Sequence, residues 1–315
     1  MVGEFLHAVS AVFMIFALMA VGFVLGKLGW MDSGDKKFVS RYVVNIAVPM
    51  NCVNGILNNF TRDDFKGMGL YLPVPYITIL TCLLISFAAG KLLRLPRERF
   101  GVFVAMSFLS NALFIGLPLS TQLFGETCVG YVMLYYIGST TFTQTVCVML
   151  VERSGTAAPQ NHSAAALCRD IFTKPPILAL LASMCMLFLG VRPPEIVMSF
   201  AKYCSNTLTP LALMYCGYIV FELGIRNIRM EKGIPVMLFI RLLVSPAVCA
   251  LICLLTGVQG LCRSVFIVES ALPTVSQITV MAGAYGADEE YSATGAILSM
   301  LGIFLTIPVL MVILS

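Results

Sequence analysis

The chain has 315 residues, of which 59% are hydrophobic and only 11% charged, and its formal net charge is +4. Soluble domains carry roughly 25% charged residues, so this composition excludes a water-soluble globular protein and indicates an integral membrane protein. The apolar runs are continuous and do not alternate, which argues against a β-barrel and predicts an all-α fold.

Uncharged runs predict ten membrane-spanning helices, which is what 315 residues accommodate at roughly 20 residues per span. The eighth run contains Arg241, and the ninth contains Arg263 and Glu269. In chain order the expected spans are 5–26, 42–59, 68–90, 100–124, 127–151, 175–191, 203–221, 233–256, 262–286 and 291–314.

The second half of the sequence repeats the first at an offset of 161 residues, the difference between 202 and 41. The pattern R-Y-x-x-N-x-x-x-P over residues 41–49 returns as K-Y-x-x-N-x-x-x-P over residues 202–210, and Phe124-Gly125 returns as Tyr285-Gly286. Five spans in each half is an odd number, so the second half enters the membrane in the opposite sense. The expected fold is therefore two inverted five-helix repeats, an arrangement typical of secondary transporters. The expected division is 1–154, a connecting loop at 155–169, and 170–315.

Lysine and arginine are distributed unevenly between the two sides of the membrane. Fourteen lie in the loops that join odd to even spans, including the central loop, and five lie on the opposite side. The excess of basic residues marks the cytoplasmic side. We therefore expect a plasma-membrane protein with both termini extracellular.

Helix-breaking residues fall at equivalent depths in spans four and nine. The offset aligns Asn111 with Leu272, the residue before Pro273. Both lie about eleven residues into their spans. At the rise of an α-helix this is about 16 Å, or half of a ~30 Å hydrocarbon core. A break frees backbone groups that lipid cannot satisfy, so it faces protein or a wet cavity. Half-helix N-termini there would attract an anion, and the opposed carbonyl ends could hold a cation. A simple kink is the alternative. Breaks are expected at Pro49, Gly116, Pro118, Pro210 and Pro273.

Apart from Arg263 at the start of span nine, two charged residues lie within the spans. A charge at mid-membrane costs about 2.5–3.5 kcal/mol on insertion scales, so Arg241 needs a partner. It could contact a substrate carboxylate, act as a fixed positive charge in place of a coupling cation, or pair with Glu269 or with freed carbonyls. Glu269 is either a proton-carrying carboxylate or an ordinary wet group near the outer interface.

Polar side chains near the breaks are candidates for substrate binding. Asn45 and Asn206 could instead serve as interhelical hydrogen-bonding groups, and Gln144 in span five is expected to reach the broken segments. The substrate-binding candidates are Ser110, Asn111, Ala112, Pro273, Thr274, Ser276, Gln277, Gln144, Asn45 and Asn206.

Several motifs resemble the auxin efflux carrier family, which includes plant PIN auxin exporters and bacterial organic-acid permeases. They are N-x-x-x-x-G-x-P-L at 111–119, R-x-x-x-x-P-A-V at 241–248, A-L-P at 271–273 and A-Y-G at 284–286. The resemblance covers nearly the whole chain. The short 152–170 loop favours the bacterial type, and Ser110 stands where plant exporters have proline.

This resemblance implies broken crossover helices at spans four and nine, a scaffold of spans 1, 2, 6 and 7, and a transport domain of spans 3–5 and 8–10 that moves like an elevator. It implies transport of a carboxylate such as malate or malonate, or of an auxin-like acid, and is compatible with proton or sodium coupling and with a homodimer through the scaffold. A sodium-coupled symporter resembling the bile-acid symporters and a non-transporting membrane sensor are the alternatives.

Enzyme, metal and cofactor motifs are missing from the sequence. It contains no H-E-x-x-H, no Walker A motif and no C-x-x-C among its eleven cysteines, and the only histidines are His7 and His162. We expect no catalytic site, no metal, no cofactor and no nucleic-acid partner.

Overall fold

The computed structural model describes residues 2–59, 70–156, 173, 175–224, 230–275 and 277–314. Throughout these ranges the regular structure is helical, and the described residues contain one isolated β-bridge and no strand. The all-α class predicted from the continuous apolar runs is confirmed.

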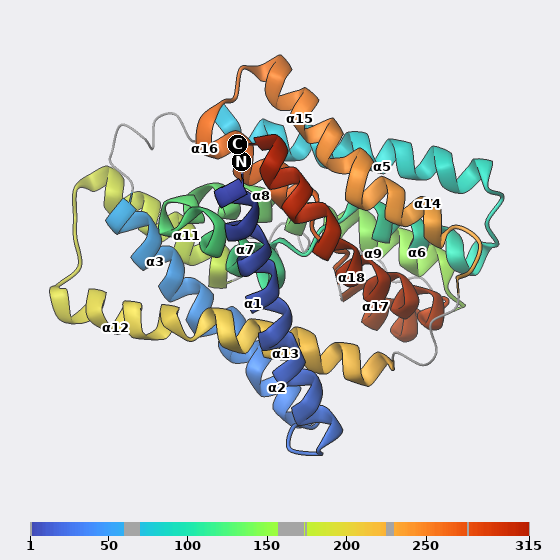
Figure 1. Cartoon of the computed structure of the whole chain (residues 1–315), viewed down its shortest axis with the longest axis horizontal. Helices are drawn as coiled ribbons and strands as arrows, with labels where there is room; N and C mark the ends of the chain where they lie inside the picture. The colour runs from blue at the N-terminus through green and yellow to red at the C-terminus, as the bar shows by residue number, and fades with distance from the viewer. Residues whose placement is uncertain are drawn as a thin grey trace.

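One set of helices comes from the beginning and the middle of the chain, and it occupies the left and lower parts of Figure 1. Within it α1 packs along α13, and α3 packs against α11 and α12. We call this set the first helix group. Its members are α1 (Val2–Lys27), α2 (Ser33–Tyr42), the π-helical turn η1 (Val43–Ala47), α3 (Val48–Asn59), α11 (Pro175–Leu189), α12 (Glu195–Asn206) and α13 (Leu208–Leu223).

The remaining described helices form the second helix group. Here α5 packs against α6 and α15, and α17 packs against α9 and α18. Its members are α5 (Pro73–Leu92), α6 (Arg97–Phe108), η2 (Ala112–Gly116), α7 (Leu117–Phe124), η3 (Glu126–Cys128), α8 (Val129–Phe142), η4 (Thr143–Cys147), α9 (Val148–Ser154), α14 (Ile234–Phe239), η6 (Ile240–Val244), α15 (Ser245–Thr256), α16 (Gly260–Ser270), α17 (Gln277–Tyr285) and α18 (Glu289–Leu314).

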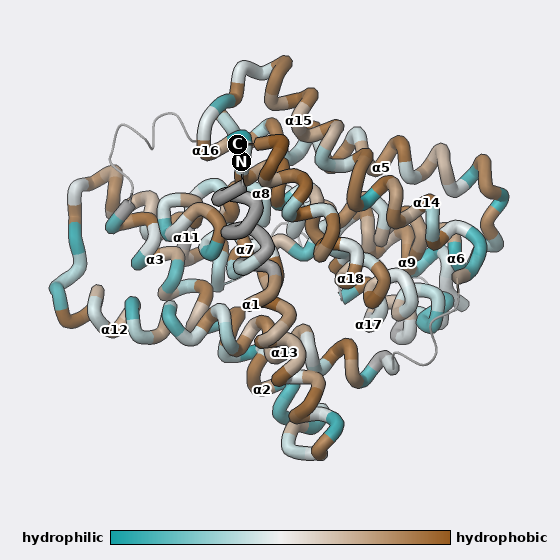
Figure 2. Tube along the Cα trace, in the orientation of Figure 1, coloured by the Kyte–Doolittle hydropathy of each residue, from teal (hydrophilic) through white to brown (hydrophobic). Residues whose placement is uncertain are grey.

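Four of the described helices are long and apolar enough to cross a membrane. They are Pro73–Leu92, Glu126–Ser154, Ile234–Thr256 and Glu289–Leu314, and they coincide with the expected third, fifth, eighth and tenth spans. Figure 2 shows hydrophobic residues running along α15 and α18. Shorter apolar helices cover Phe13–Lys27, Ala112–Phe124 and Pro175–Leu189.

Three π-helical turns precede a proline-containing helix start. Pro49, Pro118 and Pro246 are each the second residue of an α-helix that follows η1, η2 or η6. Proline lacks an N–H and its ring clashes with the carbonyl four residues earlier, and a wider turn relieves that clash. The chain therefore stays helical through Pro49, and likewise through Gly116 and Pro118, where breaks were expected. Pro210 is the third residue of α13, just after the turn at Thr207.

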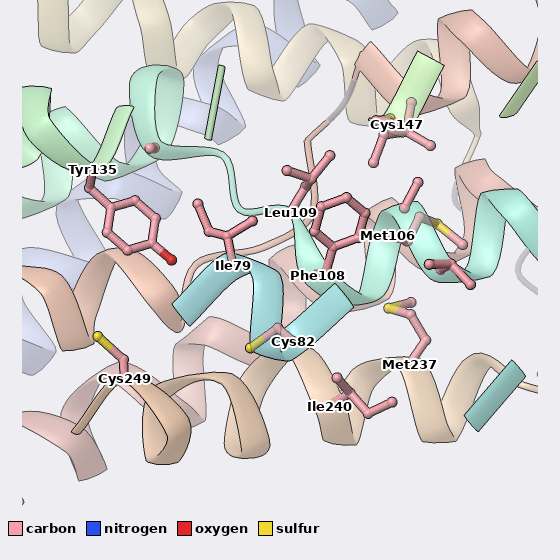
Figure 3. Close-up of a cluster of buried hydrophobic side chains, with 14 of the residues drawn as sticks. Ile79, Cys82, Met106, Phe108, Leu109, Tyr135, Cys147, Met237, Ile240 and Cys249 are labelled. Carbon is pink, nitrogen blue, oxygen red and sulfur yellow. The ribbon is translucent and has the colours of Figure 1, made fainter. Parts of the chain in front are cut away.

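Buried apolar side chains hold the second helix group together. In the cluster of Figure 3, Phe108 and Leu109 from the end of α6 pack with Ile79, Tyr135 and Ile240, which come from three other helical segments. These five residues are at most 3% exposed. The end of α6 is therefore embedded in the core.

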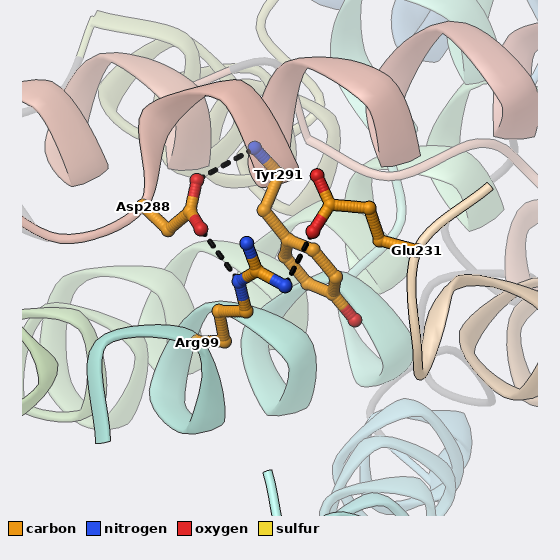
Figure 4. Close-up of polar contacts among 4 residues, drawn as sticks. All are labelled: Arg99, Glu231, Asp288 and Tyr291. Atoms are coloured by element: carbon orange, nitrogen blue, oxygen red, sulfur yellow. Dashed lines mark hydrogen bonds and ion pairs between the residues drawn. The ribbon is translucent and has the colours of Figure 1, made fainter. Parts of the chain in front are cut away.

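An ionic cluster joins the ends of three elements of the second helix group (Figure 4). Arg99 Nε donates to Asp288 Oδ2 at 2.6 Å, and a second guanidinium nitrogen pairs with Glu231. The Arg99 guanidinium also lies 5.3 Å from the ring centroid of Tyr291. Partial burial alone would lower the pKa of Arg99, but the hydrogen bond and charge of Asp288, together with Glu231, raise it. The cluster ties α6 to the segment before α14 and to α18.

Glycines bring α1 and α13 into close contact. A Cβ atom at Gly22 would lie 1.9 Å from the carbonyl oxygen of Met214, and one at Gly217 would lie 1.8 Å from that of Met19. Small residues let membrane helices approach at backbone distance. Each helix thus places a glycine against the other helix's backbone.

We expect Gly22→Val to destabilise the protein, because its side chain would meet a backbone that cannot rotate away. Overpacking costs about 1–3 kcal/mol, and thermal unfolding in detergent should show a melting temperature lower by several degrees. Val21→Leu, at a residue 45% exposed on the same helix, is the control and should melt like the wild type. Equal melting of the glycine variant would show that α1 and α13 are not packed this closely.

Candidate functional site

Two helices of the second group are interrupted by short non-helical segments. α6 ends at Phe108 and regular helix resumes at Ala112, whereas α16 ends at Ser270 and α17 begins at Gln277. Asn111 and Pro273 both lie in these non-helical segments.

The two non-helical segments pair with each other. Ser110 and Thr274 form an antiparallel bridge, and Asn111 N donates to Pro273 O at 2.8 Å. Because buried backbone groups need partners, each interruption satisfies part of the other. Neither segment could be placed in an apolar interior alone.

Hydroxyl groups from neighbouring helices complete the pairing. Ser139 of α8 donates to Ser110 O at 3.3 Å, and the N–H of Thr274 donates to Ser299 Oγ of α18 at 3.2 Å. All four residues are buried. We call the two paired segments, 109–111 and 271–275, the crossing. Serine side chains of α8 and α18 support it.

Two helix N-termini meet at this crossing. Asn111 caps the first, because its Oδ1 accepts a hydrogen bond from Phe114 N at 3.2 Å. The second belongs to α17, which begins at Gln277. Free N–H groups and the helix dipole make such ends partly positive and favourable for anions.

The far ends of these half-helices are also alike. α7 ends at Phe124 and α17 at Tyr285, and the next residues, Gly125 and Gly286, have φ of +73° and +71°. Only glycine adopts this left-handed conformation readily at a helix end. The repeated aromatic-glycine pairs of the sequence therefore terminate two similarly placed helices.

A cavity of about 340 Å³ adjoins the crossing at the boundary of the two helix groups. Hydroxyl and amide groups line one part and apolar side chains another, and none of the described lining residues is charged. The lining residues are Val44, Asn45, Ser110, Asn111, Ala112, Leu113, Phe114, Tyr136, Ser139, Thr140, Thr143, Pro175, Val275 and Gln277.

The cavity brings together five of the substrate-binding candidates, namely Asn45, Ser110, Asn111, Ala112 and Gln277. The amide nitrogen of Asn45 donates to Arg41 O at 2.7 Å, so the side chain folds back on its own helix.

The other candidates are placed differently. Pro273 and Thr274 form the backbone pairing and are buried behind the cavity. Asn206 is an exposed residue at the end of α12 and does not line the cavity. Ser276 and the side chain of Gln144 lie outside the described residues.

The predicted substrate-binding set did not include the polar face that α8 and the start of η4 present to the cavity. Tyr136, Ser139, Thr140 and Thr143 are spaced i, i+3, i+4 and i+7, so they lie on one helix face. This periodicity was available in the sequence, and it would have identified the face.

Arg241 is fully buried beside the C-terminal ends of α6 and α16, the first halves of the interrupted helices. Its guanidinium donates to Ser270 O at the end of α16, to Ser107 O near the end of α6 at 3.5 Å, and to Ser245 Oγ at 2.7 Å. Of the alternatives considered for this residue, the structure has the contact with freed carbonyls. Arg241 does not line the cavity.

Glu269 is also fully buried, so it is not a wet group at an interface. Ser120 of α7 donates to its Oε1 at 2.7 Å, and its Oε2 has no hydrogen-bond partner among the described residues. The carboxylate lies against Gly116, where a Cβ atom would be 2.3 Å from Oε2. Gly116 therefore makes room for Glu269 beside the half-helix that begins at Asn111.

We expect Gly116→Ala to displace Glu269 and to lower the melting temperature by several degrees. The added methyl would also meet Leu272 Cδ1 at 2.5 Å, in a tightly packed region. Gly295→Ala is the matched control, because its Cβ would meet only the flexible side-chain ends of Met106 and Met237. If both alanine variants melted alike, the close fit at Gly116 would be wrong.

Comparison with known proteins places the sequence among membrane transporters. A family model described as membrane transport protein matches residues 7–311. A protein of Methanocaldococcus jannaschii described as an uncharacterized transporter is 24% identical over 292 residues, which cover 90% of this chain and 92% of that protein. An uncharacterized transporter of Methanothermobacter thermautotrophicus is 24% identical over 287 residues, covering 88% and 89% of the two chains. The match confirms the resemblance drawn from the motifs.

Proposed function

We propose, from the premise that this chain belongs to the membrane transport protein family, that it is a secondary transporter of small organic anions in the plasma membrane. The observation that carries the proposal is the cavity of about 340 Å³ onto which Asn111 and Gln277 open, each at the N-terminus of a half-helix.

The electrostatics of the cavity favour an anion with one carboxylate. Each helix N-terminus acts like roughly +0.5 charge, so two of them balance about one negative charge without a basic side chain. Phe114, Tyr136 and Val275 offer an apolar surface for the rest of the molecule. Within the expected carboxylate class, a monocarboxylate with an apolar body fits better than a dicarboxylate of the malate or malonate type.

The ten-span inverted repeat is part of this proposal. It is supported by helices that match at the offset of 161: α5 with the run from α14 to α15, α6 with α16, α7 with α17, and the run from α8 to α9 with α18. In each pair the bounds correspond within three residues. On this reading the two interruptions are crossover segments at the bilayer midplane.

We propose further that the first helix group is the scaffold and the second the transport domain of an elevator. Apolar side chains dominate the contact between the groups, with Val48 and Ile56 packing with Leu117 and Val132. The hydrogen bonds between helices described above each join members of one group, as does the ion pair between Lys36 and Glu222. An apolar boundary lets one body slide past the other without breaking specific polar contacts.

Transport is tested by counterflow in proteoliposomes with a panel of labelled monocarboxylates and dicarboxylates. We expect Asn111→Ala to reduce counterflow at least about tenfold, since it removes the helix cap and a polar group of the cavity. Gln122→Ala, at an exposed amide on α7, is the control and should transport like the wild type. Saturable transport unchanged by Asn111→Ala would refute the site, and binding without movement in folded protein would indicate a sensor.

Glu269 is the proposed proton carrier if transport is coupled to a pH gradient. Glu269→Gln retains the shape and an oxygen that accepts from Ser120, but its amide does not take up or release a proton near neutral pH. We expect counterflow to continue in this variant while acceleration by an imposed pH gradient is lost. Glu290→Gln, at an exposed carboxylate, should keep the acceleration. A Glu269→Gln variant still driven by the gradient would remove Glu269 from this role.

A further inference from the structure

Arg241 lies between the carbonyl ends of α6 and α16, and within the described residues none of its hydrogen bonds goes to an acidic side chain. Its hydrogen bonds go to Ser270 O, Ser107 O and Ser245 Oγ, and its side chain is fully buried. The buried carboxylate nearest in sequence to this point, Glu269, is instead bonded to Ser120. The counter-charge of Arg241 is therefore supplied by the backbone.

The charge balance at this point is complete. A helix C-terminus acts like roughly −0.5 charge, so the ends of α6 and α16 together balance about one positive charge. The other groups around the guanidinium, Tyr135, Cys82 and Cys249, are uncharged side chains when protonated, and Figure 3 shows these three residues around one region of the core. The carbonyl ends of α6 and α16 therefore match one positive charge, which Arg241 supplies.

A backbone carbonyl pair at opposed half-helix ends is the type of site at which transporters of this architecture bind a coupling cation. Here the carbonyls already accept from Arg241, and Arg241 lies outside the cavity. The side chain of Ser245, one turn along the same helix, holds a guanidinium nitrogen at 2.7 Å and fixes its orientation.

We propose that Arg241 is a tethered cation that takes the place of a dissociable one. The substrate site at the N-terminal ends of the second half-helices is then assembled without sodium. This inference rests on the proposed transport function. Arg241 is a positioning residue, because it holds the ends of α6 and α16 together and does not touch the cavity. It separates this chain from a sodium-coupled symporter, in which the cation would have to enter and leave in each cycle.

The first test is counterflow by the wild type with all sodium and potassium replaced by N-methyl-D-glucamine, a cation too large for a buried site. We expect the rate to change by less than about twofold. A fall of more than about tenfold, restored by sodium, would overturn the inference while leaving the carrier function intact.

The second test removes the tethered charge. Arg241→Gln should lose at least about tenfold in counterflow in N-methyl-D-glucamine and recover in part when guanidinium or sodium is added at millimolar concentration. Arg241→Lys, which keeps a positive charge, should retain more activity than Arg241→Gln. The control is Arg263→Gln, at an exposed residue of α16, which should behave as the wild type. Wild-type rates for Arg241→Gln without any small cation would contradict the proposal.

A binding-independent measurement separates this inference from the transport proposal. If no labelled acid moves, the melting temperature in detergent still tests whether Arg241 replaces a bound cation. Small cations should raise the melting temperature of Arg241→Gln and leave that of the wild type unchanged. An equal response of both proteins would refute the tethered cation. If Arg241→Gln does not fold, the sodium dependence of the wild type and the activity of Arg241→Lys carry the decision.

Discussion

The structure depends on one constraint, which is that backbone groups released from a helix inside an apolar protein must find partners. The segment at 109–111 and the segment at 271–275 each leave the helical path. They meet that constraint together, through the bridge between Ser110 and Thr274 and the hydrogen bond from Asn111 N to Pro273 O. Removing either interruption would leave the other with unpaired polar groups, so the two belong to one structural unit.

This unit has two electrically different sides. The N-terminal ends face a cavity with neutral polar walls, and the carbonyl ends face the buried guanidinium of Arg241. The N-terminal ends of the second half-helices thus leave a partly positive surface beside the cavity, whereas the negative ends of α6 and α16 contact Arg241 within the protein. The proposed binding of an anion by neutral groups is consistent with this division, because the positive charge of Arg241 contacts carbonyls outside the cavity.

The packing around the unit differs between its two sides. Gly116 admits the carboxylate of Glu269, and Ser120 bonds to it, so α7 and α16 are locked to each other. Towards the first helix group, the same half-helix presents Leu117 and Leu113 to Val43, Val48 and Ile56. The unit is therefore held within the second helix group by specific contacts and borders the first through apolar ones, which is consistent with the proposed movement.

The sequence by itself determined the helical class, the apolar runs and the irregular points at Asn111 and at Leu272-Pro273, which the repeat offset aligns, because helix propensity, proline chemistry and composition act locally. It also marked Arg241 and Glu269 as unusual, since charges are costly in such runs. Only the tertiary structure decided their partners: Arg241 contacts carbonyls of two helices far apart in sequence, and Glu269 contacts Ser120, 149 residues away. It also decided that Asn45 lines the cavity while its repeat equivalent Asn206 does not, because the chain folds the two halves around a single crossing and a contact between distant segments leaves no local trace in the sequence.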